Sequence, residues 1–371
     1  MRALESAPST VYYGVCAGRA LRRAGSQWAF DGAALEAGLR GAVRLFLIWA
    51  YPLPRLHSPL SPSILPCMWE AAILTLGVAM GATDHTAGVT VDNRRVYATV
   101  DGLGLKATVY RPPDTGEDRR PAVVLIHGGA WMVGSRRHKR WYGRRLAMHG
   151  YVAVAISYRT MPRHPFPACL QDVKSAVQWL RAHADEFRID PQRIAALGDS
   201  AGGHLTLMLA MTRPEDGLEE NENATPGNSA STDIQAAVSL YGPSDLRYYL
   251  EPPPVMRLGG VTPRYIRRFA GAPSEGDPGD RVLAASPIRY ARADACPVLL
   301  VHATKDRLVP FEQSEALHGA LRACGVPARL VSIPRKGHGF DYVHPRIRAH
   351  VFAEILAFLD EHLGAHPART P

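Results

Sequence analysis

The sequence predicts an α/β protein whose mostly parallel, eight-stranded sheet is covered by helices on both faces. Short apolar runs of strand length recur along the chain without polar alternation, which is typical of strands buried on both faces. Segments with helical spacing separate most of these runs, and that alternation implies a parallel sheet. The chain of 371 residues, 46% hydrophobic and 21% charged, can bury such a core.

Eight strands are expected, and the first two differ from the others. Residues 95–100 and 105–112 alternate apolar and polar side chains around the turn-like DGLG. No helix separates them, so we expect an antiparallel hairpin at one edge of the sheet. The six further strands are expected at 122–129, 151–158, 193–198, 234–242, 297–303 and 328–334.

Helices are expected between these strands because apolar residues recur there at helical spacing. The clearest case lies at 170–183, where Leu170, Val173, Val177 and Leu180 share one face. Helical segments are expected at 136–150, 170–183, 201–211, 311–325 and 347–363.

Residues 1–88 differ in composition from the rest and are expected to form a leader before a single domain at 89–366. The apolar patch at 71–82 is too short to span a bilayer comfortably, and no compact basic segment precedes it as in a signal peptide. A poorly ordered or surface-packed leader is favoured. A cleaved signal, a membrane-associated segment within 41–82 and a true start at Met68 are the open alternatives.

Two segments interrupt the alternation of strands and helices. Residues 213–233 are polar and acidic, which indicates a surface loop. Residues 247–282 mix aromatic residues with proline and glycine between two late strands, where an insertion can cover an active site. We expect a lid there, and a surface excursion without function is the alternative.

Charge and cysteine content indicate which kinds of partner to expect and in which cellular compartment the protein works. The net charge is +9, but the excess arginine is scattered, with no zinc-ligand spacing and no basic stripe interleaved with aromatics, so a nucleic-acid partner is not expected. The odd number and wide spacing of the cysteines argue against a disulfide framework or a metal site and favour the cytoplasm. The five cysteines are Cys16, Cys67, Cys169, Cys296 and Cys324.

Ser200 is the candidate nucleophile. The segment Gly198-Asp199-Ser200-Ala201-Gly202 matches G-x-S-x-G, directly after a buried strand and directly before an apolar helix. Such a tight turn exposes the serine hydroxyl above the carboxyl edge of the sheet, and glycines two positions to either side remove a clash. An ordinary helix N-cap serine is the alternative.

An oxyanion hole is expected at HGGAW, residues 127–131, which follows the third strand. Its glycines allow the backbone to approach a reacting carbonyl, and Gly129 and Ala130 are the expected N–H donors. Ala201, directly after the candidate nucleophile, supplies another donor. We interpret His127 as a structural residue of this loop rather than as the catalytic base.

The acid and base are expected in the chain order Ser, Asp, His. Asp306 follows the seventh strand and His338 the eighth, so both lie where the carboxyl ends of strands converge. Asp306 would orient the imidazole of His338, which would take the proton of Ser200. Asp199 is expected to point away and brace neighbouring loops. Rival acids and structural histidines are Asp245, Asp341, His204, His302 and His344.

Three stretches, 127–131, 158–204 and 297–340, resemble α/β-hydrolase esterases, and the resemblance covers about residues 89–365. Residues 158–204 are similar to hormone-sensitive-lipase-like carboxylesterases. Residues 297–340 are similar to the acetyl-xylan and feruloyl esterase-like (BD-FAE) branch. The resemblance implies the α/β-hydrolase fold and serine-dependent ester hydrolysis without metal or organic cofactor. It implies a triad of Ser200, Asp306 and His338, with an oxyanion hole framed by Gly128, Gly129, Ala130 and Ala201.

Two departures from the family pattern matter. The loop has HGGA where HGGG is usual, which crowds the acyl side slightly. Residues 1–88 are not convincing amphipathic helices, so a lid built from N-terminal helices is not expected.

The function expected from these residues is hydrolysis of short-acyl esters of small molecules, with acetyl esters of carbohydrates as one candidate. A prolyl-oligopeptidase-like peptidase shares the C-terminal pattern, but this chain shows no long N-terminal propeller segment. A ligand-binding module without catalysis is the third alternative. The sequence does not predict the oligomeric state.

Overall fold

The computed structural model describes residues 88–113, 119–218, 230–251 and 262–364, together with the backbone of two short strands near the N-terminus. The chain divides into two compact units, Met1–Ala72 and Ile73–Pro371. In the first, β1 (Leu21–Ala24) and β2 (Gln27–Phe30) pair antiparallel. The expected leader, its membrane segment and the start at Met68 otherwise lie outside the described residues, so those expectations and the domain boundary stay predictions.

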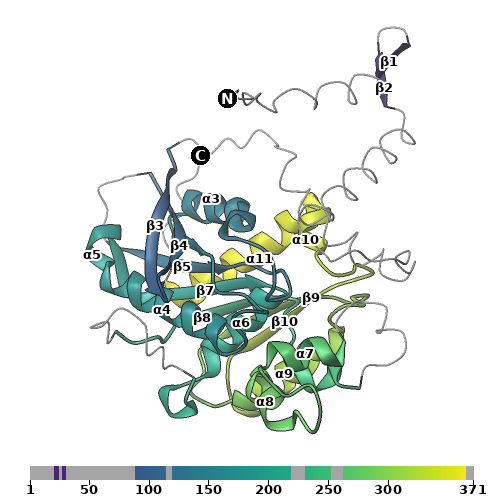
Figure 1. Cartoon of the computed structure of the whole chain (residues 1–371). Helices are drawn as coiled ribbons and strands as arrows, with labels where there is room; N and C mark the ends of the chain where they lie inside the picture. Colours follow the sequence, from purple (N-terminus) through teal and green to yellow (C-terminus); the bar gives the residue numbers. More distant parts are fainter. Residues whose placement is uncertain are drawn as a thin grey trace, which may run out of the picture. The chain divides into compact units, whose positions relative to one another are not determined.

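The second unit contains an eight-stranded sheet, as predicted, in the order β10-β9-β8-β7-β5-β6-β4-β3 (Figure 1). Strands β5 to β10 run parallel, whereas β3 and β4 form the expected antiparallel hairpin at one edge. The strands are β3 (Thr90–Val100), β4 (Leu103–Arg111), β5 (Arg120–Ile126), β6 (Val152–Ile156), β7 (Ile189–Asp199), β8 (Ala236–Leu240), β9 (Val298–Ala303) and β10 (Ala328–Ile333).

Helices cover both faces of this sheet, as the two separate hydrophobic clusters demonstrate. Helices α4, α6 and α9 contribute to one cluster and α3 and α11 to the other. The helices are α3 (Arg140–Met148), α4 (Ala168–Ala182), α5 (Ala184–Phe187), α6 (Ala201–Met211), α7 (Pro263–Phe269), α8 (Gly279–Ala284), α9 (Phe311–Ala323), α10 (Phe340–Val343) and α11 (Pro345–Leu363). Short 3₁₀ helices are η2 (Arg136–Lys139), η3 (Pro214–Asp216), η4 (Leu246–Tyr249) and η6 (Pro287–Tyr290).

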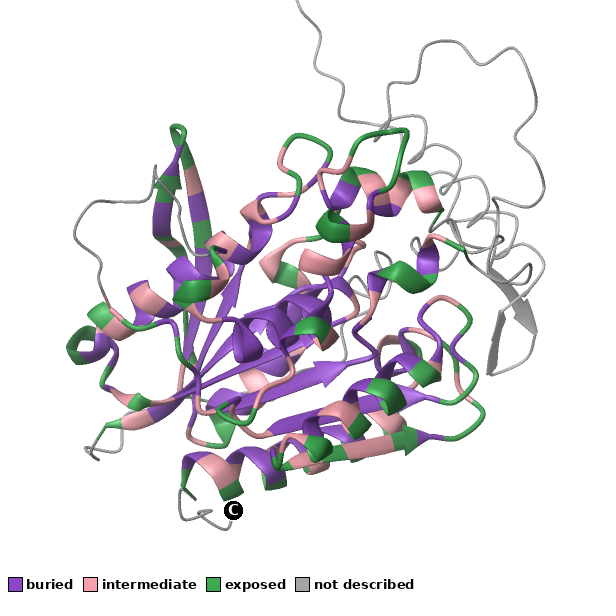
Figure 2. Cartoon of the chain, turned by 90° about the horizontal axis from the view of Figure 1, so that it is seen from below, coloured by how far each residue is buried: buried purple, intermediate pink, exposed green. Residues whose placement is uncertain are grey.

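The continuous apolar runs follow from this double coverage. In β5, Val124 and Ile126 join one cluster, while Val123 and Leu125 between them join the other. Successive side chains of a strand point to opposite faces, so a strand covered on both sides needs apolar residues throughout. Figure 2 shows the central strands as buried and the exposed residues gathered on the outer helices and loops.

Several strand ends differ from those predicted. Strand β3 begins at Thr90 rather than 95, because its first residues are mostly polar and mostly exposed at the sheet edge, where no apolar pattern is required. Strand β5 ends at Ile126, since His127 and the glycines after it leave the sheet as a loop. The segment expected to be a lid contains η4, α7 and the start of α8, and its residues 252–261 lie outside the described ones.

Candidate active site

Ser200 occupies the tight turn between β7 and α6. Its backbone has φ 50° and ψ −119°, a conformation that L-residues rarely adopt and that costs on the order of 1–3 kcal/mol. The turn is held because the Ser200 N–H donates to the Leu240 carbonyl of β8 over 2.8 Å. Ser200 also precedes the first residue of α6, so it combines a strained turn with a helix N-terminus, which favours negative charge.

Gly198 and Gly202 make this turn sterically feasible. A Cβ atom at Gly198 would lie 2.1 Å from the Gly202 carbonyl oxygen, and one at Gly202 would lie 2.2 Å from the Ile126 carbonyl oxygen. Both obstacles are backbone atoms, which no rotamer change can move. The expectation that larger side chains collide at these two positions is therefore confirmed.

The structure brings Ser200, His338 and Asp306 into one hydrogen-bonded chain. The Nε2 atom of His338 lies 2.9 Å from the Ser200 Oγ, and its Nδ1 donates to the Asp306 Oδ2 over 2.7 Å. The three residues come from the ends of β7, β9 and β10, all at the carboxyl edge of the parallel strands. The Tyr241 ring forms a T-shaped contact with the imidazole, with 4.7 Å between ring centroids. This geometry allows proton transfer from the serine to the imidazole.

Asp306 is buried and held as a carboxylate. Its Oδ1 accepts the N–H groups of Leu308 and Val309 at 2.9 and 3.0 Å. Burial alone would raise its pKa, but the charge of His338 and hydrogen bonds from His302 and His338 hold the pKa well below its usual range. An acceptor that stays ionised fixes the tautomer of His338 that can accept the serine proton.

His302 is a structural neighbour of this acid, as expected. Its Nε2 donates to the Val309 carbonyl at 2.8 Å and lies 3.3 Å from the Asp306 Oδ2. Its Nδ1 is hydrogen-bonded to the Ser314 hydroxyl at 2.7 Å. The fully buried ring therefore fixes the position of the loop that carries Asp306. In the sequence, the only sign of this contact is the pattern H-x-x-x-D.

The oxyanion loop has an unusual backbone. Gly129, Ala130 and Trp131 have φ angles of 117°, 52° and 56°, so three consecutive residues adopt positive φ. A Cβ at Gly129 would lie 2.1 Å from the Val133 carbonyl oxygen. No acceptor within the described ranges is hydrogen-bonded to the N–H groups of Gly129 and Ala130. These two groups are available to a substrate oxygen, and the donor role expected for them stays a prediction.

Gly128 differs from Gly129 and Ala130, because its N–H is already occupied. It donates to the Asp199 Oδ1 over 2.9 Å, so Gly128 frames the hole by its position and not as a donor. Its lack of a side chain still matters, since a Cβ there would lie 2.9 Å from Asp199 and 3.2 Å from the Ser200 Cβ. A motif identifies the loop but does not reveal which of its N–H groups the protein itself uses.

Asp199 supports the oxyanion loop through its hydrogen bond with the Gly128 N–H, as expected. Besides Gly128, it forms an ion pair with the fully buried Lys139 and accepts the Tyr342 hydroxyl at 3.1 Å. Burial alone would raise its pKa, but the Lys139 ammonium lowers it. The sequence gives no sign of this role of Lys139, because a lysine in the basic stretch RRHKR resembles a solvated residue.

Helix α7 is fastened to the same loop. The Tyr265 hydroxyl donates to the Ala130 carbonyl, and the Phe269 ring stacks on Trp131 with 4.1 Å between centroids. The Phe269 carbonyl also accepts the Phe166 N–H at 2.7 Å. This described part of the segment expected to be a lid therefore buttresses the oxyanion hole.

We predict that Tyr265→Phe lowers kcat about five- to tenfold with little change in KM, the loss expected for one hydrogen bond. The phenyl ring keeps its packing, but the left-handed Ala130 loses its hydroxyl partner. Steady-state kinetics with p-nitrophenyl acetate provide the measurement. Tyr248→Phe, at an exposed tyrosine of η4, is the matched control. Equal kcat values in both variants and the wild type would refute the role of Tyr265.

The rival acids lie elsewhere. The Asp245 carboxylate caps η4 and pairs with Arg247 at 2.7 Å. Asp341 is fully buried and accepts the hydroxyl groups of Tyr142 and Tyr241. Burial and the nearby charge of Asp199 raise the Asp341 pKa. Neither carboxylate is hydrogen-bonded to the imidazole of His338 in the described part of the chain.

The rival histidines have structural partners. His344 is half-buried at the N-terminus of α11. His204 accepts the Trp131 Nε1–H at 3.2 Å and donates from Nε2 to the Ala285 carbonyl at 2.8 Å. His127 is fully buried, stacks on Tyr158 and is hydrogen-bonded to the Gly128 carbonyl at 2.7 Å. His127 and His204 are therefore structural, as expected.

Burial lowers the pKa of His204 from 6.5 to about 4, which predicts acid sensitivity. Between these values the unfolded chain binds more protons than the folded one, so the free energy of unfolding falls as the pH drops. His204 should account for about 2 kcal/mol of the loss between pH 7 and 5. Urea unfolding of His204→Gln should show a shallower loss over this range, whereas the exposed His350→Gln should follow the wild type. Identical acid limbs in all three proteins would contradict the prediction.

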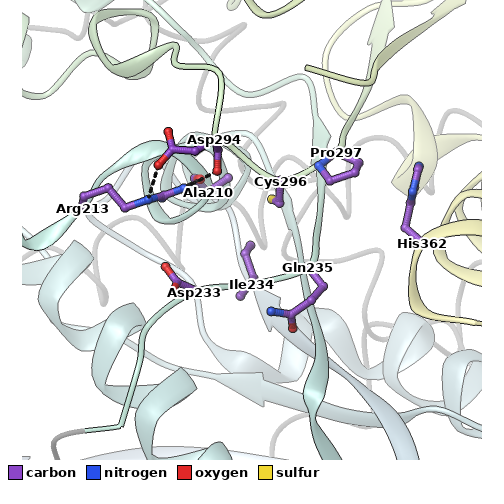
Figure 3. A pocket seen from close by; sticks show the side chains of 9 residues that line it. All are labelled: Ala210, Arg213, Asp233, Ile234, Gln235, Asp294, Cys296, Pro297 and His362. Carbon is purple, nitrogen blue, oxygen red and sulfur yellow. Dashed lines mark hydrogen bonds and ion pairs between the residues drawn. The ribbon is translucent and has the colours of Figure 1, made fainter. Parts of the chain in front are cut away.

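A cavity of about 580 Å³ lies at the amino ends of the parallel strands, opposite the candidate active site. It is lined in part by residues that precede β8 and β9 (Figure 3). Its arginine, Arg213, is committed to Asp294 through an ion pair of 3.4 Å and a hydrogen bond of 2.6 Å to its carbonyl. Burial raises the pKa of its thiol, Cys296, to about 12, so that thiol is protonated and unreactive at neutral pH. This cavity offers no activated nucleophile, and the candidate active site remains the carboxyl edge.

The sheet order, the turn at Ser200 and the loops that follow β9 and β10 define an α/β-hydrolase. Comparison with known proteins assigns the chain to the same class. The BD-FAE family model matches residues 108–321. The chain belongs to the BD-FAE family of α/β-hydrolases.

Curated relatives include mycobacterial esterases. The probable carboxylic ester hydrolase LipM of Mycobacterium tuberculosis is 34% identical over 273 residues, 70% of this chain and 60% of that protein. Esterase LipC of the same organism is 31% identical over 299 residues, 77% of this chain and 68% of that protein. The chain thus spans less than two thirds of the length of LipM.

Among solved structures, esterase Est2 of the Planctomycetes species Thermogutta terrifontis is similar to this chain. It superposes with a TM-score of 0.61 at 30% identity, covering 77% of this chain and 96% of the esterase. No helix within the described ranges combines the length and the apolar character needed to cross a bilayer.

Proposed function

We propose that this protein is a serine carboxylic-ester hydrolase that forms an acyl-enzyme on Ser200. The observation that carries the proposal is the unbroken hydrogen-bonded chain from Ser200 Oγ through His338 to Asp306. The esterase names of its relatives support the same reaction class. The proposed partner is a small-molecule ester, with no cofactor required.

The reaction proceeds in two halves. His338 Nε2 takes the proton of Ser200 as Oγ attacks the ester carbonyl, and the charged imidazole is stabilised by Asp306. The tetrahedral oxyanion accepts hydrogen bonds from the N–H groups of Gly129, Ala130 and Ala201, each of which contributes about 3–4 kcal/mol to lowering the barrier. His338 then protonates the leaving alcohol, and a water molecule activated by the same imidazole releases the carboxylic acid.

Short acyl groups are the proposed substrate class. Est2 of Thermogutta terrifontis has been solved with propionate and with butyrate bound, and both are short acids. A series of p-nitrophenyl esters of increasing acyl length tests the proposal, and kcat/KM should be greatest between acetate and butyrate. A maximum at long chains would refute it. Acetate release from acetylated xylan tests the narrower candidate, acetyl esters of carbohydrates.

Organophosphate labelling tests the nucleophile separately from the substrate. Est2 has also been solved phosphorylated by paraoxon. Paraoxon should add one diethyl phosphoryl group to this protein, located on Ser200 by mass spectrometry and absent from Ser200→Ala. Failure to label would favour a non-catalytic ligand-binding module. Efficient cleavage of a proline-containing peptide with negligible ester turnover would favour the prolyl-oligopeptidase-like alternative.

The cytoplasm is the proposed compartment. Cys169, Cys296 and Cys324, the cysteines that lie in the described part of the chain, are free thiols, which supports a reducing environment. Fractionation of cells expressing the full chain tests this proposal, and recovery from the culture medium would contradict it.

A further inference from the structure

The positive charge of this protein is distributed unevenly, contrary to the expectation from the sequence. Residues 119–171 contain nine arginines and one lysine but no aspartate or glutamate. The first part of α11 likewise has Arg346 and Arg348 before its first acidic residue, Glu354. Helices α3 and α11 cover the same face of the sheet (Figure 1), so the fold joins two basic segments that are far apart in sequence.

The two helices meet at Trp141. The Arg348 guanidinium lies 4.4 Å from the centre of the indole ring and that of Arg145 lies 5.6 Å away. The same ring forms a T-shaped contact with Phe352 of α11, with 5.3 Å between centroids. Two cations thus share one aromatic ring, an arrangement in which the cation–π attraction offsets part of their mutual repulsion.

No carboxylate within the described ranges forms an ion pair with Arg140, Arg145, Arg346 or Arg348. The Nε atoms of Arg145 and Arg348 are buried and have no hydrogen-bond partner there. Lys139, directly before α3, differs from these arginines because it has an internal counter-ion, the carboxylate of Asp199. Within the described part of the chain these four arginines are therefore cations without a carboxylate counter-ion, suited to an external anion.

Exposed apolar side chains border the same face. Met148, the last residue of α3, is 43% exposed, and Val343, the last residue of α10, is 50% exposed. Arginine, tryptophan and exposed aliphatic side chains together are typical of surfaces that contact the headgroup region of a bilayer. We propose that the α3–α11 face, formed by Arg140, Trp141, Arg145, Arg346 and Arg348, binds an anionic phospholipid surface.

A bilayer fits this face better than a nucleic acid does. Single-stranded nucleic acids stack their bases on open aromatic rings. Here Arg348 lies over the Trp141 ring and Phe352 forms a T-shaped contact with it, so the ring is not an open platform. The apolar side chains of Met148 and Val343 cannot donate a hydrogen bond or pair with a phosphate of a polyanion. They can instead enter the apolar boundary of a membrane.

The α3–α11 face adjoins the candidate active site along the chain. Helix α3 follows the oxyanion loop through η2, and α11 follows His338 through α10. The N-terminal ends of both helices therefore lie toward the carboxyl edge of the sheet. Docking would bring an ester held in the bilayer close to Ser200. This last consequence rests on the proposed function, whereas binding itself does not.

Co-sedimentation of the full chain with vesicles tests the binding. We expect binding to vesicles of equal parts phosphatidylcholine and phosphatidylserine, weak binding to phosphatidylcholine alone, and loss of binding as salt is raised. Removing both stacked arginines in R145Q/R348Q should weaken the partition roughly 25-fold, since each basic residue contributes roughly fivefold at such a surface. The matched control is R289Q/R322Q, which removes the same charge from exposed arginines elsewhere.

Hydrolysis of soluble p-nitrophenyl acetate, unchanged in both variants, shows that they are folded. If R145Q/R348Q loses this activity, R140Q/R346Q replaces it, because both of these arginines are exposed. Vesicle binding by R145Q/R348Q, or by R140Q/R346Q where it is used, that equals wild-type binding would overturn the proposal and assign binding to another segment. Equal binding to neutral vesicles, or tighter binding to duplex DNA at the same salt, would also overturn it.

Discussion

Replacing Ser200 with alanine is expected to lower kcat for p-nitrophenyl acetate roughly 10⁵- to 10⁶-fold, the loss seen when a serine hydrolase is deprived of its nucleophile. The Ser200 Oγ is the oxygen that lies 2.9 Å from the His338 Nε2, and the substitution removes this attacking atom. The oxyanion donors remain, which leaves a small residual rate above that in water. Stopped or continuous assays with purified variant provide the measurement.

The control for this prediction is Ser231→Ala, at an exposed serine that is hydrogen-bonded to Asp233. It should retain wild-type kcat, and the thermal midpoint of Ser200→Ala should not fall. A rate for Ser200→Ala within tenfold of the wild type would exclude the acyl-enzyme mechanism. Asp306→Asn should lose about 10⁴-fold, because an amide no longer favours the productive imidazole tautomer.

Lys139→Met is expected to lower the free energy of unfolding by about 3–5 kcal/mol, because it leaves the buried Asp199 carboxylate without its counter-ion. The same substitution should lower kcat, since Asp199 holds the Gly128 N–H and thereby the oxyanion loop. Urea unfolding at neutral pH and steady-state kinetics measure the two effects.

A double-mutant cycle separates charge from packing at this pair. Asp199→Asn keeps an oxygen for the Gly128 N–H but leaves Lys139 unpaired, so it should also destabilise. Combining the two substitutions removes both charges and should recover a large part of the lost stability. Strict additivity of the two losses would mean that the ion pair does not stabilise this site.

The triad could be located from the sequence because each member follows a recognisable strand. A run of apolar residues indicates a strand, and parallel strands place their carboxyl ends at one edge. Ser200, Asp306 and His338 are therefore expected to meet before any coordinates are known, and they do. The edge hairpin was predictable for a similar reason, since no helix separates its strands.

Contacts between distant segments could not be predicted in this way. Lys139 looks like one of several surface cations, and only the fold buries it against Asp199. Tyr265 reaches the Ala130 carbonyl from a proline- and glycine-rich segment with no clear periodicity. Gly128 has the same appearance as Gly129 in the motif, yet its N–H is occupied by a carboxylate 71 residues later in the chain.

The close approach at Gly198 and Gly202 constrains how this protein can diverge. A duplicated gene could abandon catalysis by changing Ser200, Asp306 or His338, and the chain would still fold around unchanged backbone contacts. It could not take the same route through either glycine, because any side chain there meets a neighbouring carbonyl oxygen near 2 Å. Descendants that have become binding proteins should therefore retain both glycines long after the serine is gone.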